Sequence, residues 1–360
     1  AGEVKMIRII TFLSTFLVFS FGSAYADPKK VGFIYIGPPG DHGWTYMHDV
    51  GRKYMESQLG DSITTTYLEN IPENADAVRA IRKLADSGHD LIFTTSFNYM
   101  DQTHEVAKDF PDIKFEHATG YIQADNVATY SARFYEGRMI EGHIAGHMTE
   151  TNTIGYIASF PIPEVVRGIN AFYLAAAKVN PDIKMKIIWV FTWYDPGKEA
   201  DAANTLINQG ADIIVQHTDT YAPCQAAQKA GVYAFGQASN QEEFCPDAHL
   251  TSIEDIWGPY YAARAKAVVD GTWSSGDTWD GMDKGMVVMS PYNNKLMPAS
   301  LIQEAVNMEV GIKDGTIHPF TGPIYNQAGE LVVPEGEVAP DGMLLGMNFY
   351  VQGIDGEVPQ

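Results

Sequence analysis

Short apolar runs alternate with amphipathic stretches over most of the chain, and this alternation indicates its architecture. The apolar runs are rich in β-branched residues and predict strands at residues 31–36, 63–67, 91–95, 114–118 and 127–130, then at 153–157, 186–191, 213–216, 233–235 and 249–251. Apolar positions at helical spacing predict helices at residues 43–58, 74–87, 101–109, 135–148, 165–179, 198–209, 222–230 and 255–270. Strands that alternate with helices in this way are typical of α/β folds with parallel sheets.

The two halves of this series resemble each other. The segment VGFI at 31–34 matches IGYI at 154–157, and ADAVRAIRKLADSGHDLIFTTS at 75–96 matches ADAANTLINQGADIIVQHT at 200–218 with a three-residue gap. The interval between the copies stays near 120 residues, which predicts two lobes of the same design. The alternative is a chance likeness between two ordinary strand–helix–strand units.

The loops that follow the predicted strands carry the candidate chemistry. In doubly wound lobes the loops at the carboxyl ends of the strands bind ligands, so two facing lobes would place both sets of loops in one cleft. Aromatic faces with a few amides and carboxylates suit a planar, hydrogen-bonding small molecule. The candidate ligand-binding residues on these loops are Asp41, His42, Trp44, Phe97, Asn98, Trp193, Tyr194, His217, Asp219, Gln237 and Asn240.

Composition and missing motifs exclude several function classes. The 360 residues are 45% apolar and 19% charged, which is enough material for about two domains. A formal net charge of −21 disfavours a nucleic-acid partner, which needs a basic face. The chain has no phosphate-binding loop and no nucleophile elbow. Asp41 and His42 could form half of a catalytic pair, but no nucleophile is marked, so we expect a binding protein and no enzyme.

Two histidines, His143 and His147, stand at i,i+4 spacing in a predicted helix. This spacing can bind zinc. The pattern lacks the glutamate of the HExxH motif, and such a pair is more often a solvated helix face. We therefore expect neither a metal nor a cofactor.

The first 26 residues have the pattern of a signal peptide. Arg8 follows Met6, the stretch 9–21 is apolar, and Ala24-Tyr25-Ala26 forms a cleavage motif, so the mature chain is expected to begin at Asp27. Residues 1–5 precede the plausible start methionine. An uncleaved anchor is the alternative, but the apolar run is short for a membrane span.

Export would place the two cysteines of the chain, Cys224 and Cys245, outside the reducing cytoplasm. An oxidising compartment permits a disulfide between them. A bonded pair and two buried thiols are both compatible with the sequence.

Three segments together resemble the basic membrane protein family. They are the opening KKVGFIYIGPPGDHGWTYMHDVGR at 29–52, GQASNQ at 236–241, and the tail FTGPIYNQAGELVVPEG with DGMLLGMNFYVQGIDG at 320–356. Members of that family are the substrate-binding components of ABC importers, typified by a purine nucleoside receptor. The resemblance extends over essentially all of residues 30–355.

The resemblance implies a type I periplasmic binding protein, which is an α/β fold with two doubly wound lobes joined by a three-stranded hinge. The chain would cross between lobes near 123–128, 250–253 and 286–292. The expected first lobe comprises residues 27–124 and 253–288, and the expected second lobe comprises 128–250 and 292–360. We expect the Gly- and Pro-rich extension from Gly315 onward, with a hairpin at 322–334, to pack on one lobe without a role in binding.

The resemblance also implies a ligand and some of its contacts. GDHGWT supplies Asp41, Trp44 and Thr45 where the family has an aspartate, a base-stacking aromatic and an asparagine. Trp193 would close the stack from the other lobe. The family's ribose-binding aspartate is replaced by Ala238, and its lysine is missing from SIEDIW, which instead supplies Asp255 and Trp257 as further candidate ligand residues. We therefore predict a free purine base such as adenine.

The sequence leaves alternatives open for the ligand and for the role of the protein. The ligand could be a purine nucleoside, and the protein could report to a membrane receptor as a sensor rather than serve import. The expected partners are the small molecule and an inner-membrane ABC permease, and no nucleic acid is expected. The resemblance implies a periplasmic monomer.

Overall fold

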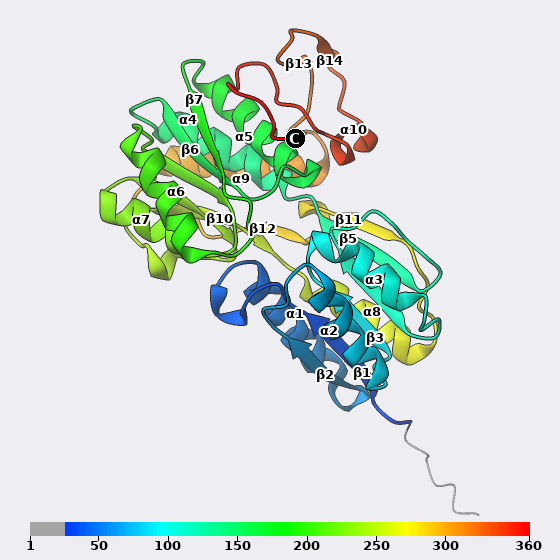
Figure 1. The fold of residues 1–360 in the computed structure, drawn as a ribbon. Helices are drawn as coiled ribbons and strands as arrows, with labels where there is room; N and C mark the ends of the chain where they lie inside the picture. The colour runs from blue at the N-terminus through cyan, green and yellow to red at the C-terminus, as the bar shows by residue number, and fades with distance from the viewer. Residues whose placement is uncertain (1–25) are drawn as a thin grey trace, which may run out of the picture.

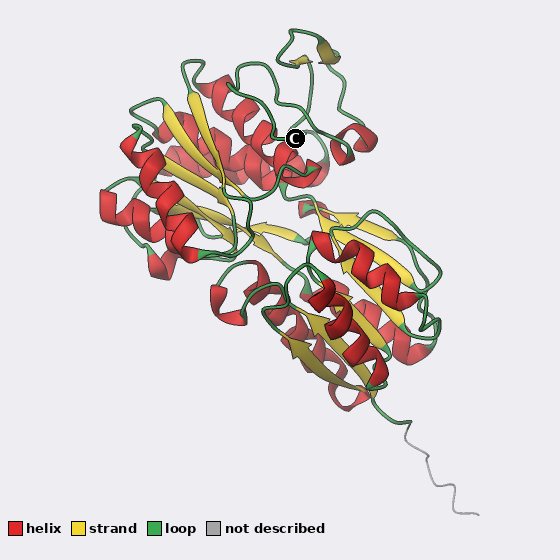
Figure 2. Cartoon of the chain, viewed as in Figure 1, coloured by secondary structure: helices red, strands yellow, loops and turns green. Residues whose placement is uncertain are grey.

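The computed structural model describes residues 26–360, which form two α/β lobes and a C-terminal extension (Figure 1). The predicted signal peptide lies, but for Ala26, outside the described residues. Each lobe has a central sheet with helices on both sides (Figure 2). Within residues 26–360 no helix combines the length and the apolar character needed to cross a bilayer.

The first lobe is built on a six-stranded parallel sheet with the order β11-β5-β4-β3-β1-β2. Its strands are β1 (Lys29–Ile34), β2 (Ile63–Leu68), β3 (Leu91–Thr94), β4 (Lys114–Ala118), β5 (Val127–Ala132) and β11 (Asp277–Asp280). Its helices are α1 (Trp44–Leu59), α2 (Ala75–Asp86), α3 (Met100–Ala107) and α8 (Gly258–Asp270). Helix α1 packs beside α8, and α2 packs beside α3.

The second lobe repeats this design in the order β12-β10-β9-β8-β6-β7. Its strands are β6 (Thr153–Ala158), β7 (Lys184–Trp189), β8 (Ile213–His217), β9 (Tyr233–Ala238), β10 (His249–Asp255) and β12 (Val287–Met289). Its helices are α4 (Tyr135–Met148), α5 (Pro163–Val179), α6 (Pro196–Asn208), α7 (Ala222–Ala230) and α9 (Ala299–Asp314). The equal strand orders are what the internal repeat predicts, and only the last strand differs, because β12 runs antiparallel to β10.

Burial on both faces explains why the strands appear as continuous apolar runs in the sequence. Every residue of β3 and of β8 is buried, because helices cover both sides of each sheet. The first four residues of β5 show the same pattern, and this strand pairs with β4 before the chain leaves the first lobe.

The chain crosses between the lobes three times. The crossings lie at 132–135, 255–258 and 280–287. The first and second differ from the sequence-based boundaries near 123–128 and 250–253, because β5 completes its ladder with β4, and β10 continues its ladder through Asp255. The first lobe therefore comprises 29–132 and 258–280, and the second comprises 135–255 and 287–360.

The C-terminal extension packs mainly on the second lobe (Figure 1). It contains the predicted hairpin, formed by β13 (Ile324–Tyr325) and β14 (Leu331–Val333), and then α10 (Asp341–Leu345). Asn170 of α5 donates to the carbonyl of Phe349 at 2.8 Å, and the Val351 N–H donates to the Asn170 side chain at 3.0 Å. Near the first crossing, Arg133 forms a two-bond pair with Asp341, each bond 2.8 Å long.

A disulfide joins Cys224 of α7 to Cys245, with Cα atoms 5.9 Å apart. Cys245 follows the short 3-10 turn Glu242–Phe244. The bond therefore ties the segment after β9 to the helix that precedes this strand.

Candidate functional site

A narrow cavity lies between the lobes. The first lobe contributes Trp44, Ser96, Phe97 and Thr119, and the second contributes Glu164, Trp193, His217, Asp219 and Gln237. The cavity adjoins a wider space of about 260 Å³, which shares Phe97, Thr119 and Glu164 with it. A ligand can therefore reach the inner cavity from the side of the wider space.

The position of this cavity follows from the strand order. In each sheet the first strand of the lobe pairs with the next two strands on opposite sides, and a crevice opens where the order reverses. Trp44 and Ser96 follow β1 and β3 on the first lobe, while Glu164 and Asp219 follow β6 and β8 on the second. The same switch point occurs in both lobes and faces one cavity.

The loop after β1 is held by the carboxylate of Asp41. This carboxylate accepts backbone N–H groups at the start of α1, from Gly43 at 2.8 Å, Tyr46 at 2.9 Å and Thr45 at 3.1 Å. These bonds satisfy donors that a helix N-terminus leaves unpaired, and they favour negative charge there. Asp41 is therefore a positioning residue that does not line the cavity.

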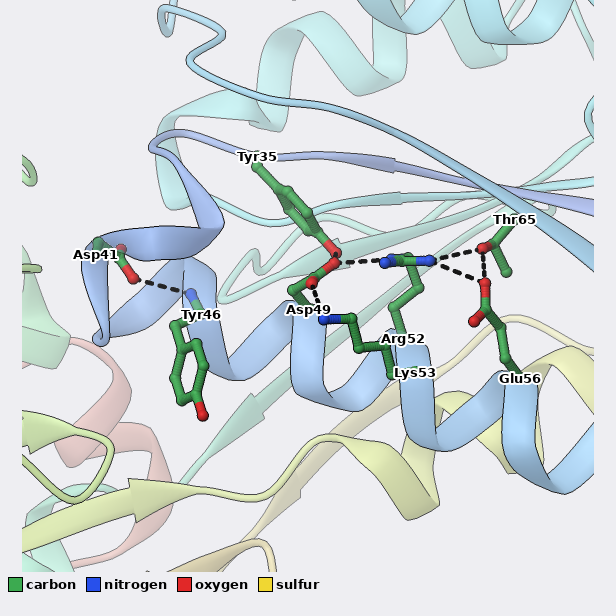
Figure 3. A network of polar contacts seen from close by, with 8 residues as sticks. All are labelled: Tyr35, Asp41, Tyr46, Asp49, Arg52, Lys53, Glu56 and Thr65. Carbon is green, nitrogen blue, oxygen red and sulfur yellow. Dashed lines mark hydrogen bonds and ion pairs between the residues drawn. The ribbon is translucent and has the colours of Figure 1, made fainter.

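A polar network fixes the helix that begins with Trp44 (Figure 3). The carboxylate of Asp49 accepts from the Tyr35 hydroxyl at 3.0 Å and from Arg52 Nε at 2.8 Å. Arg52 also donates to Glu56 and to Thr65 on β2, each at 2.9 Å. Helix α1 is thereby attached to the edge strand β2 of the sheet.

Contacts on several sides orient the Trp44 ring. Its Nε1–H donates to the Thr95 carbonyl at 2.7 Å. Trp257 meets the ring edge-on at 5.8 Å between centroids, and Trp257 itself stacks on His48 at 4.9 Å. Because the ring nitrogen is already bonded, Trp44 offers a ligand only its aromatic surface.

The residues before Trp44 contact the opposite lobe. The His42 carbonyl accepts from the Ser239 hydroxyl, and from Gln241 Nε2 at 3.2 Å. A Cβ atom at Gly43 would lie 2.1 Å from the Asp219 carbonyl oxygen. Only glycine permits the two loops to approach this closely, so the structure represents the lobes in a closed arrangement.

Four residues that line the cavity from the second lobe each have a buried polar atom with no hydrogen-bond partner within residues 26–360. These atoms are Trp193 Nε1, Glu164 Oε1, His217 Nδ1 and Asp219 Oδ2, and all four residues are buried. Buried polar groups without partners are rare in native proteins, because each costs the free energy of its lost hydration. A ligand in the cavity can supply the missing hydrogen bonds.

The buried Arg138 determines which atoms of the Gln237 amide remain available to a ligand. Its guanidinium donates to the Gln237 side-chain oxygen at 2.8 Å and to the Gln216 carbonyl at 2.9 Å, and it pairs with Glu141 at 2.9 Å. With its oxygen bonded to Arg138, the Gln237 amide has its NH₂ group left as a donor.

A glutamate near the start of α2 and another near the start of α6 each hold a binding loop of their lobe. Glu73 accepts from the Ser96 hydroxyl at 2.8 Å and from the Asn98 N–H at 2.9 Å. Glu199 of α6 accepts from the Thr220 N–H at 3.0 Å. These carboxylates fix the loops without lining the cavity.

The cavity is electronegative. Burial raises the pKa of the Asp219 carboxyl well above its usual range, and the nearby Asp41, Glu199 and Glu73 carboxyls raise it further. Burial lowers the pKa of His217, although its contact with Glu164 at 3.2 Å opposes the shift. The imidazole is therefore neutral near pH 7, and with Nε2–H donated to Glu164, its Nδ1 is an acceptor.

The structure brings together six of the predicted site residues: Trp44, Phe97, Trp193, His217, Asp219 and Gln237. Seven others lie outside the cavity lining. Asp41 caps α1, His42 bridges the lobes, Asn98 lies beside Glu73, Tyr194 packs on Gly37, and Trp257 supports Trp44. Asn240 is exposed and accepts the Glu242 N–H at 3.1 Å. Asp255 is buried, and both its oxygens lack partners among the described residues.

Three lining residues were not predicted: Ser96, Thr119 and Glu164. Each follows a predicted strand of its lobe, so the loop argument could have included them. Glu164 gives the weakest signal, because a glutamate in the first turn of a helix is also the ordinary choice for the helix dipole.

The chain matches a family of known proteins over most of its length. The sequence profile of the ABC transporter substrate-binding proteins described as PnrA-like matches residues 28–321. This chain belongs to that family. The match confirms the resemblance seen in the sequence, since the purine nucleoside receptor typifies the same group.

Relatives of this PnrA-like protein include two similar over nearly its whole length. A purine-binding protein of Brucella abortus (strain 2308) is 57% identical over 340 residues, covering 94% of this chain and 97% of the relative. A putative glucose-binding ABC transporter protein of Haloferax volcanii is 35% identical over 338 residues, covering 94% and 83%. Members of this family are substrate-binding components of transport systems, which act outside the cytoplasmic membrane and are not enzymes.

Solved structures support the fold. An ABC transporter solute-binding protein from Aeropyrum pernix K1 aligns with a TM-score of 0.71 at 19% identity, covering 81% of this PnrA-like chain and 93% of that protein. The two-lobed type I periplasmic binding fold is thereby confirmed.

The close approach at Gly43 predicts a specific effect on binding. Gly43→Ala places a methyl group against the Asp219 carbonyl, so the lobes cannot close fully, and we expect at least a tenfold loss of ligand affinity. Thermal unfolding of the ligand-free protein should change little, because the lobes can move apart. Gly40→Ala is the matched control, since a Cβ atom there meets nothing within 4 Å. Calorimetric titration that gave equal affinities for both variants would contradict the closed arrangement.

The buried Asp219 predicts a dependence of stability on pH. The native carboxyl keeps its proton at pH values where the unfolded chain has lost it, so stability falls as the pH rises above the usual Asp pKa of 3.8. Asp219→Asn should remove this contribution and raise the free energy of unfolding of the ligand-free protein by about 0.5–2 kcal/mol near pH 7. Urea denaturation from pH 4 to 8 measures the slope, with the exposed Asp125→Asn as control. A slope unchanged by Asp219→Asn would show that Asp219 ionises as freely in the native protein as in the unfolded chain.

Proposed function

We propose that this protein binds a free purine base, adenine or a close relative, between its lobes and presents it to an ABC permease. The observation that carries the proposal is the set of buried, unpartnered polar atoms around the cavity, combined with aromatic surfaces from both lobes. The 57% identical relative, which is described as purine-binding, supports it.

The cavity and a purine have complementary hydrogen-bonding groups. The protein offers donors at Trp193 Nε1 and the Gln237 amide, and acceptors at Glu164 and His217 Nδ1. The Asp219 carboxyl accepts and, while it keeps its proton, also donates. Adenine offers amino and ring N–H donors together with ring-nitrogen acceptors on its edges. Trp44 and Phe97 supply flat apolar surface from one lobe, and Trp193 supplies it from the other. Stacking on such rings holds a base in the plane where its edges reach the polar atoms.

The electrostatics restrict the ligand class further. The lining holds two carboxylates and no lysine or arginine. An anionic ligand such as a nucleotide would lose its hydration there without a cation to pair with, which costs several kcal/mol. A neutral, donor-rich heterocycle instead satisfies the carboxylates.

One substitution favours a base over its nucleoside. Ala238, at the family's ribose-binding aspartate, is buried and has no side-chain group to bond a sugar hydroxyl. A nucleoside would also lack the ring N–H at its glycosidic position, which removes one donor for the carboxylates.

Transport accounts for the two-lobed design. Closure about the three crossings buries the ligand, and the closed pair of lobes forms a surface that a permease can distinguish from the open form. We propose a periplasmic monomer for this role. A sensor that reports to a membrane receptor would use the same closure, so import is tested by uptake of radiolabelled adenine in cells that lack the gene.

The ligand class is tested by calorimetry on chain 27–360 after unfolding and refolding to remove carried ligand. Adenine, guanine, adenosine, guanosine, ribose and glucose are titrated separately. We expect adenine to bind at least tenfold more tightly than adenosine, and ribose and glucose not to bind. Tighter adenosine binding would favour the nucleoside alternative, and glucose binding alone would overturn the purine proposal.

Trp44 should contribute through its aromatic face. Trp44→Ala is expected to weaken adenine binding by about 5- to 150-fold, because stacking contributes about 1–3 kcal/mol per base. Trp44→Phe keeps an aromatic face and should lose much less affinity. The two variants are compared by calorimetry, and their urea denaturation is measured in parallel. Equal losses in both would mean that the ring acts by packing inside the first lobe.

A further inference from the structure

Three metal-ligating side chains meet on the second lobe, away from the cavity lining. His143 and His147 lie on α4, and Glu304 lies on α9. Their ligand atoms all lie within 4.8 Å of one another. The sequence showed the two histidines, but Glu304 follows them by more than 150 residues and is brought to them only by the packing of α9 on α4.

Helix geometry explains why the two imidazoles face the same way. Residues four apart on a helix lie one turn above each other, so His143 and His147 share a face of α4. Their rings are 4.8 Å apart between centroids. The same helix packs closely on α5 at Gly142 and Gly146, where a Cβ atom would lie 2.2 Å and 2.8 Å from the nearest atom. This tight packing fixes the rotation of α4 and therefore the direction of the histidine face.

The two distances from the imidazoles to Glu304 are close to those of a tetrahedral metal site. Zinc bonds to imidazole nitrogen and carboxylate oxygen are about 2.0–2.2 Å long, which places neighbouring ligand atoms about 3.3 Å apart. His143 Nε2 and His147 Nε2 lie 3.1 Å and 3.7 Å from the same oxygen, Glu304 Oε2. Small side-chain rotations would place an ion at bonding distance from all three atoms.

Two imidazoles approach one oxygen of Glu304, although an ion pair needs only one of them. A single protonated imidazole would pair with Glu304, whereas here both Nε2 atoms point to the same oxygen. The three side chains are 22%, 42% and 52% exposed, so solvent can supply a fourth ligand. Two imidazoles and one carboxylate are the donor set that zinc and its neighbours in the first transition row accept.

We propose that His143, His147 and Glu304 form a binding site for a divalent transition metal of the zinc class, with water completing the coordination. The site joins two helices that enter the second lobe just after a crossing, since α4 follows β5 and α9 follows β12. A bound ion therefore links α4 to α9 within the second lobe and leaves the ligand cavity unchanged. This inference does not depend on the proposed purine function.

Zinc titration of tag-free protein tests the site. Calorimetry should show one zinc equivalent whose affinity falls at least tenfold in His147→Ala and in Glu304→Gln. The midpoint of thermal unfolding should rise with zinc in the wild type and not in these two variants. His104→Ala is the matched control, because this surface imidazole belongs to α3 of the first lobe and contacts the Ile122 carbonyl instead of a carboxylate.

Two outcomes would overturn the proposal. One is a zinc affinity that is the same in the wild type and in His147→Ala, and the other is the absence of a zinc-dependent rise in the unfolding midpoint of the wild type. Adenine titrations with and without zinc are run beside these. Because the site lies outside the cleft, a change in base affinity would indicate zinc binding at the cavity carboxylates instead.

Discussion

The cleft depends on the hydrogen bonds that the Asp41 carboxylate accepts at the start of α1. By accepting three backbone N–H groups, this carboxylate fixes the residue at which α1 begins. It thereby also fixes the positions of the neighbouring residues. Gly43 is placed against the other lobe, and Trp44 is placed at the cavity wall. Burying the charged Asp41 carboxylate is itself unfavourable, because burial raises the Asp41 pKa to about 7 despite the three N–H donors. An aromatic platform at a strand–helix junction thus requires a buried charge beside it.

Much of the fold was accessible from the sequence, since buried parallel strands leave continuous apolar runs and the two lobes repeat one pattern. Helix α9 was not predicted, although Leu301, Ala305 and Ile312 are buried at helical spacing. It follows the irregular hinge segment, where no strand–helix alternation leads up to it. The crossing points were displaced by several residues, because ladder pairing of β5 with β4 decides where a strand ends and local composition does not.

The site was predictable at the level of loops and less so at the level of single side chains. Trp257 was expected among the ligand-binding residues, but it lies outside the cavity lining and its ring meets Trp44 edge-on. Asn240 stands in a ligand-type loop and points to solvent, because its side chain caps the following turn. Which member of a loop faces the cavity depends on caps and on contacts with the opposite lobe, and these involve residues far apart in sequence.

The odd number of crossings between the lobes has a consequence for the ends of the molecule. After the third crossing the chain stays in the second lobe, so the whole C-terminal extension moves with that lobe, while β1 begins in the first (Figure 1). The separation between Asp27 and Gln360 is therefore a coordinate of lobe opening. Dyes attached at these two positions would convert ligand-driven closure into a change in energy transfer without a label near the cavity.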